Sequence, residues 1–421
     1  MEFRTVVLPN GLEIVAECNA EAYSTALGFF VKTGARDETD EVAGVSHFLE
    51  HMVFKGTPTR SAEDVNREFD EMGAHYNAFT NEENTAFYAA VLPEFQNRAL
   101  ELLADILRPS LRKDDFDTEK KVIVEEIRMY EDQPPFGADE KCRAAFFGDH
   151  PLGRSVLGTI ASIEAMPVEA MREYFHRRYL AGNIVLAAAG RIDFDAMVTA
   201  AARASDGWEP GGCPRTIEPA QPHRGFQAIE RATSTQQYLL QLAAGPAADN
   251  RERYAAKLLA MVLGDDSGSR LYWELVDPGL AEHAELCHCE YDGAGVFMTT
   301  MACAPEAAAE NLQSLLDVYG AAQSDGITPA ELEQAKSKVR SRIVLASERP
   351  RGRLFSIGGD WVYRREYRSV KEELDLVASL RVADAMDVLA RYPLSECVTL
   401  TIGPLADLAD PSDSSSASEN R

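Results

Sequence analysis

Five consecutive residues, His47-Phe48-Leu49-Glu50-His51, have the types and spacing needed to hold a metal ion and use it in hydrolysis. On a helix, His47 and His51 lie one turn apart on the same face, so both imidazoles can ligate one metal ion. Glu50 lies on an adjoining edge, where its carboxylate can act as a general base without coordinating the metal. The alternative is two histidines that fall on an amphipathic helix by chance. Because the chain has only eight histidines, the spacing favours the metal site.

A catalytic zinc ion generally has three protein ligands, so this interpretation requires a third side chain from elsewhere in the sequence. The predicted helix at 118–131 offers three acidic candidates. Glu125 shares its stripe with basic residues and is expected on the surface, whereas Glu126 emerges from an apolar stripe, where a zinc ion would compensate its charge. Glu119 lies seven residues before Glu126 on the same face, where it can orient a ligand imidazole or the water. A salt bridge to a neighbouring helix explains Glu119 equally well. Glu50 and Glu119 are thus the expected catalytic side chains.

Taken together, these residues resemble the pitrilysin and mitochondrial processing peptidase family, whose His-x-x-Glu-His order is the inverzincin pattern. The resemblance spans nearly the whole chain and includes further segments typical of the shorter members, at 10–12, 34–38, 77–80, 150–154 and 269–272. It implies that His47, His51 and Glu126 bind one Zn²⁺ per chain and that Glu50 is the catalytic base. It also implies a zinc metalloendopeptidase acting on extended or unfolded peptides, and a clam-like homodimer or heterodimer of related chains. A metal-dependent hydrolase of other substrates fits the same zinc site.

The stretch from Asn77 to Thr80 alternates as a strand does and continues through a short turn into another strand. An exposed strand edge can pair with an extended peptide through main-chain hydrogen bonds. In the family that the chain resembles, this Asn-Ala-x-Thr strand is such a platform, so Asn77, Ala78 and Phe79 are the expected substrate-binding residues. A plain hairpin strand, in which Asn77 makes a local turn bond, explains the stretch about equally well.

One segment departs from the family pattern. Members that are active alone usually carry an Arg and a Tyr seven residues apart after the segment at 269–272, and Val276 and Glu282 stand near those places here. Neither residue can hold substrate in the same way. The matching helices of the second half also contain no His-x-x-Glu-His motif. A non-catalytic or partner-dependent subunit of a processing-peptidase-like dimer, acting as a scaffold or in peptide binding, is therefore the alternative to an independent peptidase.

The elements that must position these side chains recur in the same order in the two halves of the sequence. Hydrophobic periodicity predicts first-half strands at 25–33, 75–80 and 84–92 and helices at about 43–54, 61–73, 94–107 and 114–131. It predicts second-half strands at 236–244, 283–290 and 294–302 and helices at about 248–263, 269–276, 305–323 and 328–347. A buried-type strand ends each series, at 183–190 and 397–403. The expected fold class is α+β, with two related α/β domains of about 200 residues, each a mainly antiparallel sheet with helices packed on it.

The segment 206–225 separates the two series and contains four glycines and four prolines. Such a composition cannot continue a helix or a central strand. We therefore expect a zinc-binding catalytic domain at 1–205, a linker at 206–225 and a metal-free domain of the same type at 226–409. The polar segment 410–421 has almost nothing to bury and is expected to be a disordered tail.

Charge and composition exclude several other functions. The chain has 68 acidic and 42 basic residues and a net charge of −26, which disfavours nucleic acid and anionic membranes as partners. Its longest strongly apolar run, at 184–190, is far shorter than the roughly 20 residues of a membrane-spanning helix. No targeting segment is evident at the N-terminus, so a cytoplasmic location is expected.

The seven cysteines are spread thinly, which favours a reducing compartment over a disulfide framework. Cys287 and Cys289 are the only close pair, with His288 between them. In a strand the two cysteines share one face and His288 points to the other, so metal binding at this tripeptide is not expected.

Overall fold

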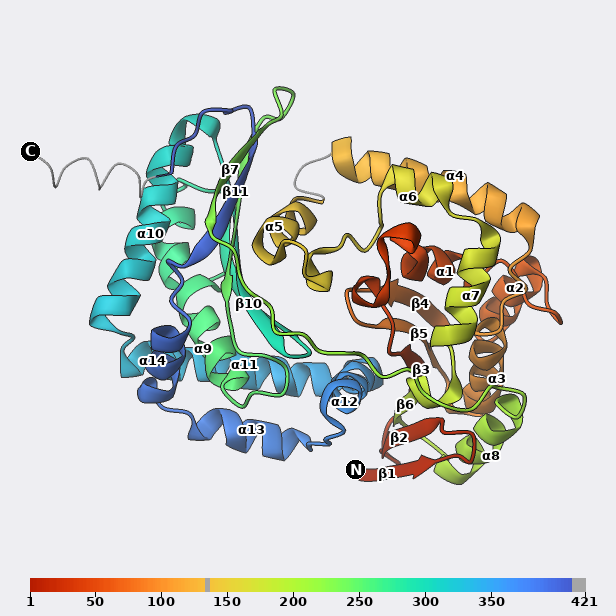
Figure 1. Cartoon of the computed structure of the whole chain (residues 1–421). Helices are drawn as coiled ribbons and strands as arrows, with labels where there is room; N and C mark the ends of the chain where they lie inside the picture. The colour runs from red at the N-terminus through yellow and green to blue at the C-terminus, as the bar shows by residue number, and fades with distance from the viewer. Residues whose placement is uncertain (133–136, 411–421) are drawn as a thin grey trace, which may run out of the picture. The chain divides into compact units, whose positions relative to one another are not determined.

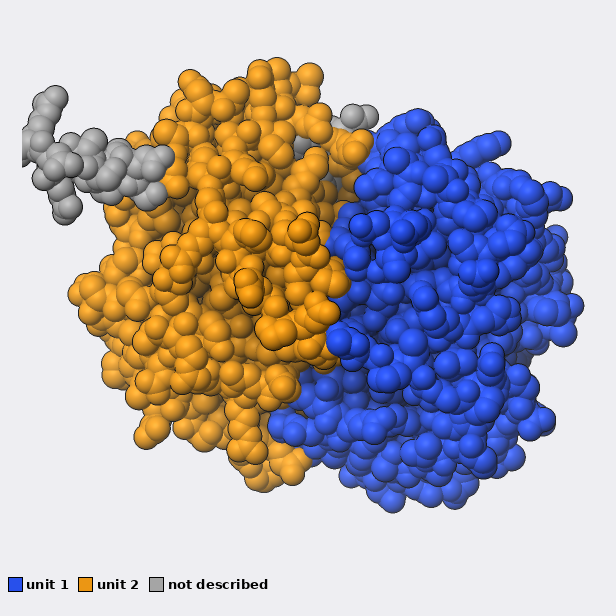
Figure 2. Space-filling model, in the orientation of Figure 1, with its two compact units in different colours: residues 1–128, 154–216, 343–370 blue, residues 129–153, 217–342, 371–421 orange. Residues whose placement is uncertain are grey.

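The computed structural model describes residues 1–132 and 137–410 of the chain. It divides into two compact units, drawn in different colours in Figure 2. Unit 1 comprises residues 1–128, 154–216 and 343–370, and unit 2 comprises residues 129–153, 217–342 and the described residues from 371 onward. Each unit contains one sheet with helices packed on it, which confirms the predicted fold class. The expected tail at 410–421 lies, beyond its first residue, outside the described residues.

Unit 1 is built on a six-stranded sheet with the order β1-β2-β6-β3-β5-β4. The strands are β1 (Glu2–Val7), β2 (Glu13–Cys18), β3 (Thr25–Val31), β4 (His75–Thr80), β5 (Thr85–Val91) and β6 (Ile184–Gly190). Neighbouring strands run antiparallel except for the parallel pair β2 and β6. The central strands β3 and β6 are apolar and buried along their whole length, as strands covered on both faces must be. Strand β4 forms one edge of the sheet, and this edge lies beside the candidate site.

The helices of unit 1 cover this sheet and carry the candidate metal ligands. They are α1 (Val45–Val53), α2 (Ala62–Glu71), α3 (Gln96–Ile106), most of α4 (Lys113–Asp132), α6 (Ile160–Ala165), α7 (Val168–Arg178), α8 (Phe194–Ala204) and α12 (Pro350–Arg364). The capping pair expected before the second helix is confirmed, because Ser61 and Asp64 exchange side-chain and main-chain hydrogen bonds at its first turn. The predicted helix boundaries agree with the structure within a few residues.

Unit 2 repeats the topology of unit 1 with five strands in the order β7-β11-β8-β10-β9. These strands are β7 (Gly225–Glu230), β8 (Gln237–Ala244), β9 (His283–Tyr291), β10 (Ala294–Cys303) and β11 (Cys397–Gly403). The first pair, β7 and β11, is parallel and the others are antiparallel, as in the β2-β6-β3-β5-β4 part of the first sheet. The internal repeat predicted from the order of elements is therefore present in the fold.

The helices of unit 2 are α5 (Ala138–Phe147), α9 (Arg253–Gly264), α10 (Ala308–Asp325), most of α11 (Pro329–Ser347), α13 (Val370–Ser379) and α14 (Val382–Arg391). Figure 1 shows α9 and α10 on one face of the sheet and α5 on the other. The helix expected at 269–276 is a single π-helical turn, Tyr272–Val276. Thr328 and Glu331 form the predicted cap of α11.

The two units exchange helices. The expected domains, 1–205 and 226–409, are continuous in sequence and do not include this exchange. Helix α5 belongs to the first half of the sequence but packs on β8 and β11, where Phe146 and Phe147 join the core of unit 2. Helix α12 belongs to the second half but packs on β2, β3 and β6, where Leu354 and Ile357 join the core of unit 1. Each sheet is therefore completed by a helix from the other half of the sequence.

The described helices include none with the length and apolar character that a bilayer crossing requires.

Candidate metal centre

Helix α1 presents His47 and His51 side by side. It begins after Gly44, which has a φ of 88°, a left-handed conformation that glycine adopts without strain. The carboxylate of Glu38 accepts hydrogen bonds from the backbone N–H groups of Gly44 and Ser46 at 2.6 and 2.7 Å, so it satisfies donors that the first helical turn leaves unpaired. The rings of His47 and His51 then lie 4.8 Å apart between centroids, one turn apart on one face.

Helix α4 brings Glu126 to this pair of imidazoles. Its Oε1 lies 3.8 Å from Nε2 of His47, and its Oε2 lies 3.7 Å from Nε2 of His51. One ligand atom from each of the three side chains falls within 4.8 Å of the others. The neighbouring Glu125 instead points away and pairs with Arg128 at 2.5 Å on the exposed side of α4. The structure thus brings together the three side chains that the sequence proposed as ligands.

Glu119 lies two helical turns before Glu126 on α4 and fixes the orientation of His51. Its Oε1 lies 2.9 Å from Nδ1 of His51, and its Oε2 lies 2.6 Å from Nζ of Lys55. A carboxylate bonded to Nδ1 fixes the tautomer and leaves Nε2 free to face the centre, an arrangement common at metal-binding histidines. Both interpretations of Glu119 are therefore represented: it orients an imidazole and it makes a salt bridge.

The electrostatics of the group suit a cation. Burial, reinforced by the neighbouring His51, lowers the pKa of His47 to about 3, so this imidazole is neutral and its lone pair is available. Burial also lowers the pKa of His51, but the hydrogen bond to Glu119 and the charges of Glu126 and Glu119 outweigh it and raise the pKa overall. Burial raises the pKa of Glu126, because its charge has no full compensation. A divalent cation among these atoms would relieve that cost.

The donor atoms also fit zinc in number, type and spacing. Two imidazole nitrogens and a carboxylate oxygen form the ligand set of several catalytic zinc sites, with the fourth position open. Bonds of about 2.0–2.1 Å in a tetrahedron place donors about 3.3–3.4 Å apart. The separations of 3.7 and 3.8 Å exceed this by a few tenths of an ångström, which small side-chain rotations can close. Nδ1 of His47 is buried without a hydrogen-bond partner, so among the described residues nothing other than packing fixes this ring.

Glu50 lies beside the ligand group but outside it. The hydroxyl of Thr80 donates a hydrogen bond of 2.6 Å to Oε2 of Glu50, which ties the carboxylate to the end of β4. Burial raises the pKa of Glu50, and the nearby charge of Glu126 acts in the same direction. A carboxyl group with a raised pKa that is held next to a metal centre has the properties of a general base.

The residues expected to bind substrate lie on β4, the edge strand next to the site. Asn77 is exposed, Ala78 is buried and Phe79 is exposed, at 36%. In the described structure, β4 pairs with β5 on one side only. The amide oxygen of Asn77 accepts the backbone N–H of Ala78 at 2.9 Å, which is the local bond expected of a plain hairpin strand. The free edge and the local bond coexist, so the geometry is compatible with both interpretations.

Two residues of the site were not identified from the sequence. Lys55 follows His51 at the spacing that separates His51 from His47 and lies just beyond the end of α1, so a basic residue at that place was a usable signal. Thr80 was noted only as part of a strand. No sequence pattern pairs a strand residue with Glu50, since that contact depends on how α1 packs against β4.

The two-unit fold and this histidine and carboxylate group together define the class of protein, and comparison with known proteins agrees. The family model described as insulinase (peptidase family M16) matches residues 13–160, and the model described as peptidase M16 inactive domain matches residues 165–339. The chain belongs to peptidase family M16, as the resemblance to pitrilysin and processing peptidases predicted.

Relatives in bacteria carry zinc protease names. An uncharacterized zinc protease of Mycobacterium tuberculosis is 34% identical over 402 residues, which cover 93% of this chain and 91% of the relative. The uncharacterized zinc protease YmxG of Bacillus subtilis is 31% identical, with 93% of this chain and 96% of the relative covered. The names of these relatives therefore refer to zinc and to proteolysis.

Solved structures show the same fold. A protease from Helicobacter pylori has a TM-score of 0.90 at 19% identity, covering 95% of this chain and 99% of that chain. A structure described as a peptidase M16 inactive domain from Pseudomonas fluorescens has a TM-score of 0.89 at 20% identity, covering 96% and 98%. At these identities the comparison concerns the fold alone.

Proposed function

We propose that this chain is a zinc metalloendopeptidase that hydrolyses extended or unfolded peptides. The observation that carries the proposal is the group formed by His47, His51 and Glu126, whose ligand atoms lie within 4.8 Å of one another beside a held carboxylate. Family membership and the zinc protease names of the relatives support the same activity.

His47, His51 and Glu126 would hold the metal ion, and Glu119 would keep His51 in the required orientation. Zinc bound there would supply a Lewis acid that lowers the pKa of a water molecule and polarises the scissile carbonyl. Glu50 would take a proton from the attacking water and pass it to the leaving amine. The Thr80 hydroxyl, at 2.6 Å, would hold Glu50 in place for this transfer.

The free edge of β4 would bind the substrate backbone. The backbone N–H of Asn81 bonds to the carbonyl of Asn84, so by the alternation of an antiparallel ladder the outward main-chain groups are those of Tyr76, Ala78 and Thr80. A peptide would take over the N–H of Ala78 from the amide oxygen of Asn77, which accepts it in the structure. An extended peptide that paired with these groups would lie along a strand ending at Thr80, which contacts Glu50. This placement selects for unfolded segments over folded proteins.

The direct test combines metal analysis with two carboxylate substitutions. We expect about one zinc ion per chain, and we expect Glu50→Gln to lower peptide hydrolysis about 10²–10⁴-fold while zinc content is retained. Glu126→Gln should lose both zinc and activity. Glu125→Gln is the matched control, because Glu125 is adjacent but exposed and paired with Arg128. Protein without stoichiometric zinc, or full activity in the Glu50 variant, would refute the proposal.

A second candidate function, a non-catalytic or partner-dependent subunit, is favoured by one observation. Val276 ends the π-helical turn of unit 2 and Glu282 follows it, so the basic and phenolic groups of independently active relatives are missing there. Activity of the isolated chain, measured beside its native mass, separates the two candidates. Hydrolysis that requires a co-purified related chain would support the second candidate and a heterodimer.

A further inference from the structure

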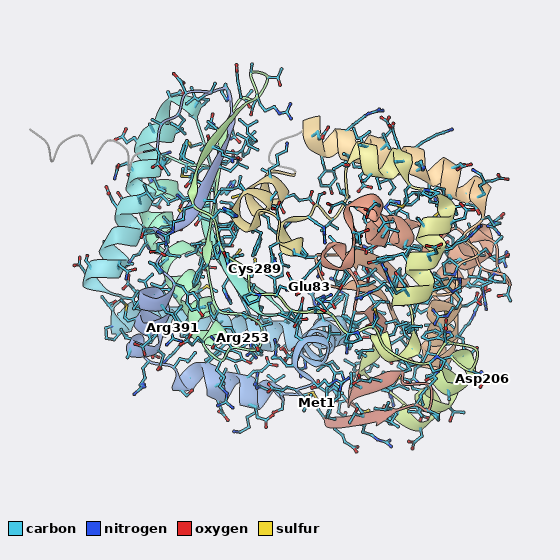
Figure 3. The ribbon with its side chains drawn as sticks, viewed as in Figure 1. Met1, Glu83, Asp206, Arg253, Cys289 and Arg391 are labelled. Carbon is cyan, nitrogen blue, oxygen red and sulfur yellow. The ribbon has the colours of Figure 1, made fainter. Side chains whose placement is uncertain are left out.

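A pair of thiols lies on the edge strand of unit 2. Cys287 and Cys289 are two residues apart on β9, so they share one face of the strand. Their Sγ atoms are 3.9 Å apart and do not form a disulfide. Cys287 is exposed and Cys289, labelled in Figure 3, is half-buried. The thiol of Cys287 is therefore accessible to a solute within unit 2, and its partner thiol is next to it.

The neighbouring strand adds a third sulfur to this face. Met298 on β10 lies directly opposite Cys287 in the antiparallel register. Directly opposed residues of an antiparallel pair project to the same face, with Cβ atoms about 4.5–5.5 Å apart. Met298 is only partly buried, and it packs with Cys289 against the same core cluster of unit 2. Two thiols and one thioether thus gather on one side of the sheet.

The other groups nearby do not complete a zinc site. His288 points to the opposite face, where its Nε2 lies 2.9 Å from the carbonyl oxygen of Pro246 and burial lowers its pKa to about 4. Val296 lies opposite Cys289 and Thr300 lies opposite Glu285. A structural zinc site takes four nitrogen or sulfur ligands, whereas this face offers three sulfurs and the exposed carboxylate of Glu285, two residues before Cys287.

We propose that Cys287, Cys289 and Met298 form a binding site for a soft monovalent metal ion, Cu(I). Thiolate and thioether ligands select Cu(I) over the harder divalent ions. Three sulfurs at about 2.3 Å from a central ion, a typical metal–sulfur bond length, stand about 4.0 Å apart in a trigonal plane. The observed separation of 3.9 Å between the two thiols matches this spacing without rearrangement. This site is independent of the proposed peptidase activity, because it uses residues of unit 2 alone.

The test is a competition titration of the full chain with Cu(I) under anaerobic, reducing conditions. The protein is first loaded with zinc, so that His47 and His51 do not compete for copper. A chromophoric Cu(I) chelator then reports how much copper the protein removes. We expect one Cu(I) per chain and a sulfur-to-copper charge-transfer absorption in the ultraviolet.

Substitutions assign the copper to these sulfurs. Cys287→Ser and Cys289→Ser each remove a metal ligand. Each should weaken Cu(I) binding by more than about 10–100-fold, which is the cost of losing a residue that only orients a ligand. Met298→Leu keeps the volume and should weaken binding less, since a thioether is a weaker ligand than a thiolate. Cys397→Ser, at a half-buried thiol on β11 of the same sheet, is the matched control and should bind as the wild type does.

Two results would overturn the inference. In the first, the wild-type chain removes no copper from the chelator. In the second, a variant that lacks both thiols binds Cu(I) as tightly as the Cys397 control does. Circular dichroism of each variant establishes that the chain is folded, so that loss of binding is not loss of structure. Zinc content should be the same in all the variants, which separates this outcome from a failure of the proposed peptidase site.

Discussion

Replacing Glu119 with Gln separates two roles that this carboxylate combines. Glu119 bonds Nδ1 of His51 at 2.9 Å and the ammonium group of Lys55 at 2.6 Å, and it is itself almost fully buried. Glu119→Gln keeps the shape of the side chain but removes the charge that both contacts need. Lys55→Met removes only the ion pair and leaves the bond to His51.

The structure gives different magnitudes for the two changes. Loss of a carboxylate that orients a metal-binding histidine typically costs 10–100-fold in metal affinity, or about 1.4–2.7 kcal/mol. The side chain of Lys55 is 39% exposed, so water replaces most of what the ion pair supplies. A partly exposed pair of this kind contributes about 0.2–1 kcal/mol, a factor of at most about 5. Zinc affinity should therefore fall much further in Glu119→Gln than in Lys55→Met.

The assay is zinc titration against a chelating dye of known affinity, carried out on both variants and the wild type at one pH. Thermal unfolding of the zinc-free proteins shows whether either variant has lost stability apart from the metal. Equal weakening in the two variants would mean that Glu119 acts as an ion-pair partner and that its bond to His51 is incidental. Unchanged affinity in Glu119→Gln would remove Glu119 from the site altogether.

Three further changes test interactions that stabilise the two units. Arg353→Met leaves the carboxylate of Glu17, which is 2% exposed, without its guanidinium partner, so the free energy of unfolding in urea should fall by about 3–5 kcal/mol; a loss below about 1 kcal/mol would contradict the argument. The hydrogen bond from Arg270 lowers the pKa of Glu331 to about 2, below its usual 4.5, so this pair stabilises the fold above pH 4.5 and loses its contribution as the pH falls towards 2. Wild-type stability should thus fall between pH 5 and pH 2 by about 1–2 kcal/mol more than that of Glu331→Gln, a value reduced because the pair is partly open to solvent, and parallel pH profiles would exclude the effect. Ser61→Ala removes the cap of α2 and should lower stability by about 1 kcal/mol, whereas Ser61→Asn should restore most of it.

Much of the fold could be predicted from the sequence because the two sheets obey short-range rules. The buried strand at 184–190 is a continuous apolar run, the buried strand at 397–403 alternates apolar residues with Thr399 and Thr401, and both strands pair with a neighbour on each side. The same order of elements in the two halves predicted a repeated topology, and the strand orders agree with it. These signals depend on local pattern and on sequence order, both of which a single sequence contains.

The selection of Glu126 over Glu125 followed the same kind of reasoning. An acidic residue on an apolar stripe needs a compensating charge, while one on a basic stripe has it already. In the structure Glu125 pairs with Arg128, and Glu126 faces the two imidazoles. The contact of Glu50 with Thr80 could not be derived this way, because it joins a helix to a strand across an angle that periodicity does not encode.

The exchange of helices between the units was not predicted, for a physical reason. The apolar face of α5 or α12 shows that each helix must pack on something, but it does not distinguish one sheet from another of the same topology. Amphipathic patterns specify burial and leave the partner open. The partner has to be specified by groups that are less interchangeable than leucine and phenylalanine.

For α12 those groups are charges. Glu13 and Glu17 stand on one face of β2, a strand that is otherwise apolar and buried, and such carboxylates are stable inside a protein only with partners. Arg353 binds Glu17 through two nitrogens, at 3.0 and 2.6 Å, and the indole N–H of Trp361 donates to Glu13 at 2.8 Å. An apolar helix in place of α12 would leave Glu17 without its guanidinium partner and Glu13 without the bond from Trp361, so both buried carboxylates would lose part of their compensation. The acidic residues of β2 therefore select α12 from a distance of more than 330 positions in the sequence, and they keep unit 1 incomplete until the second half of the chain has been made.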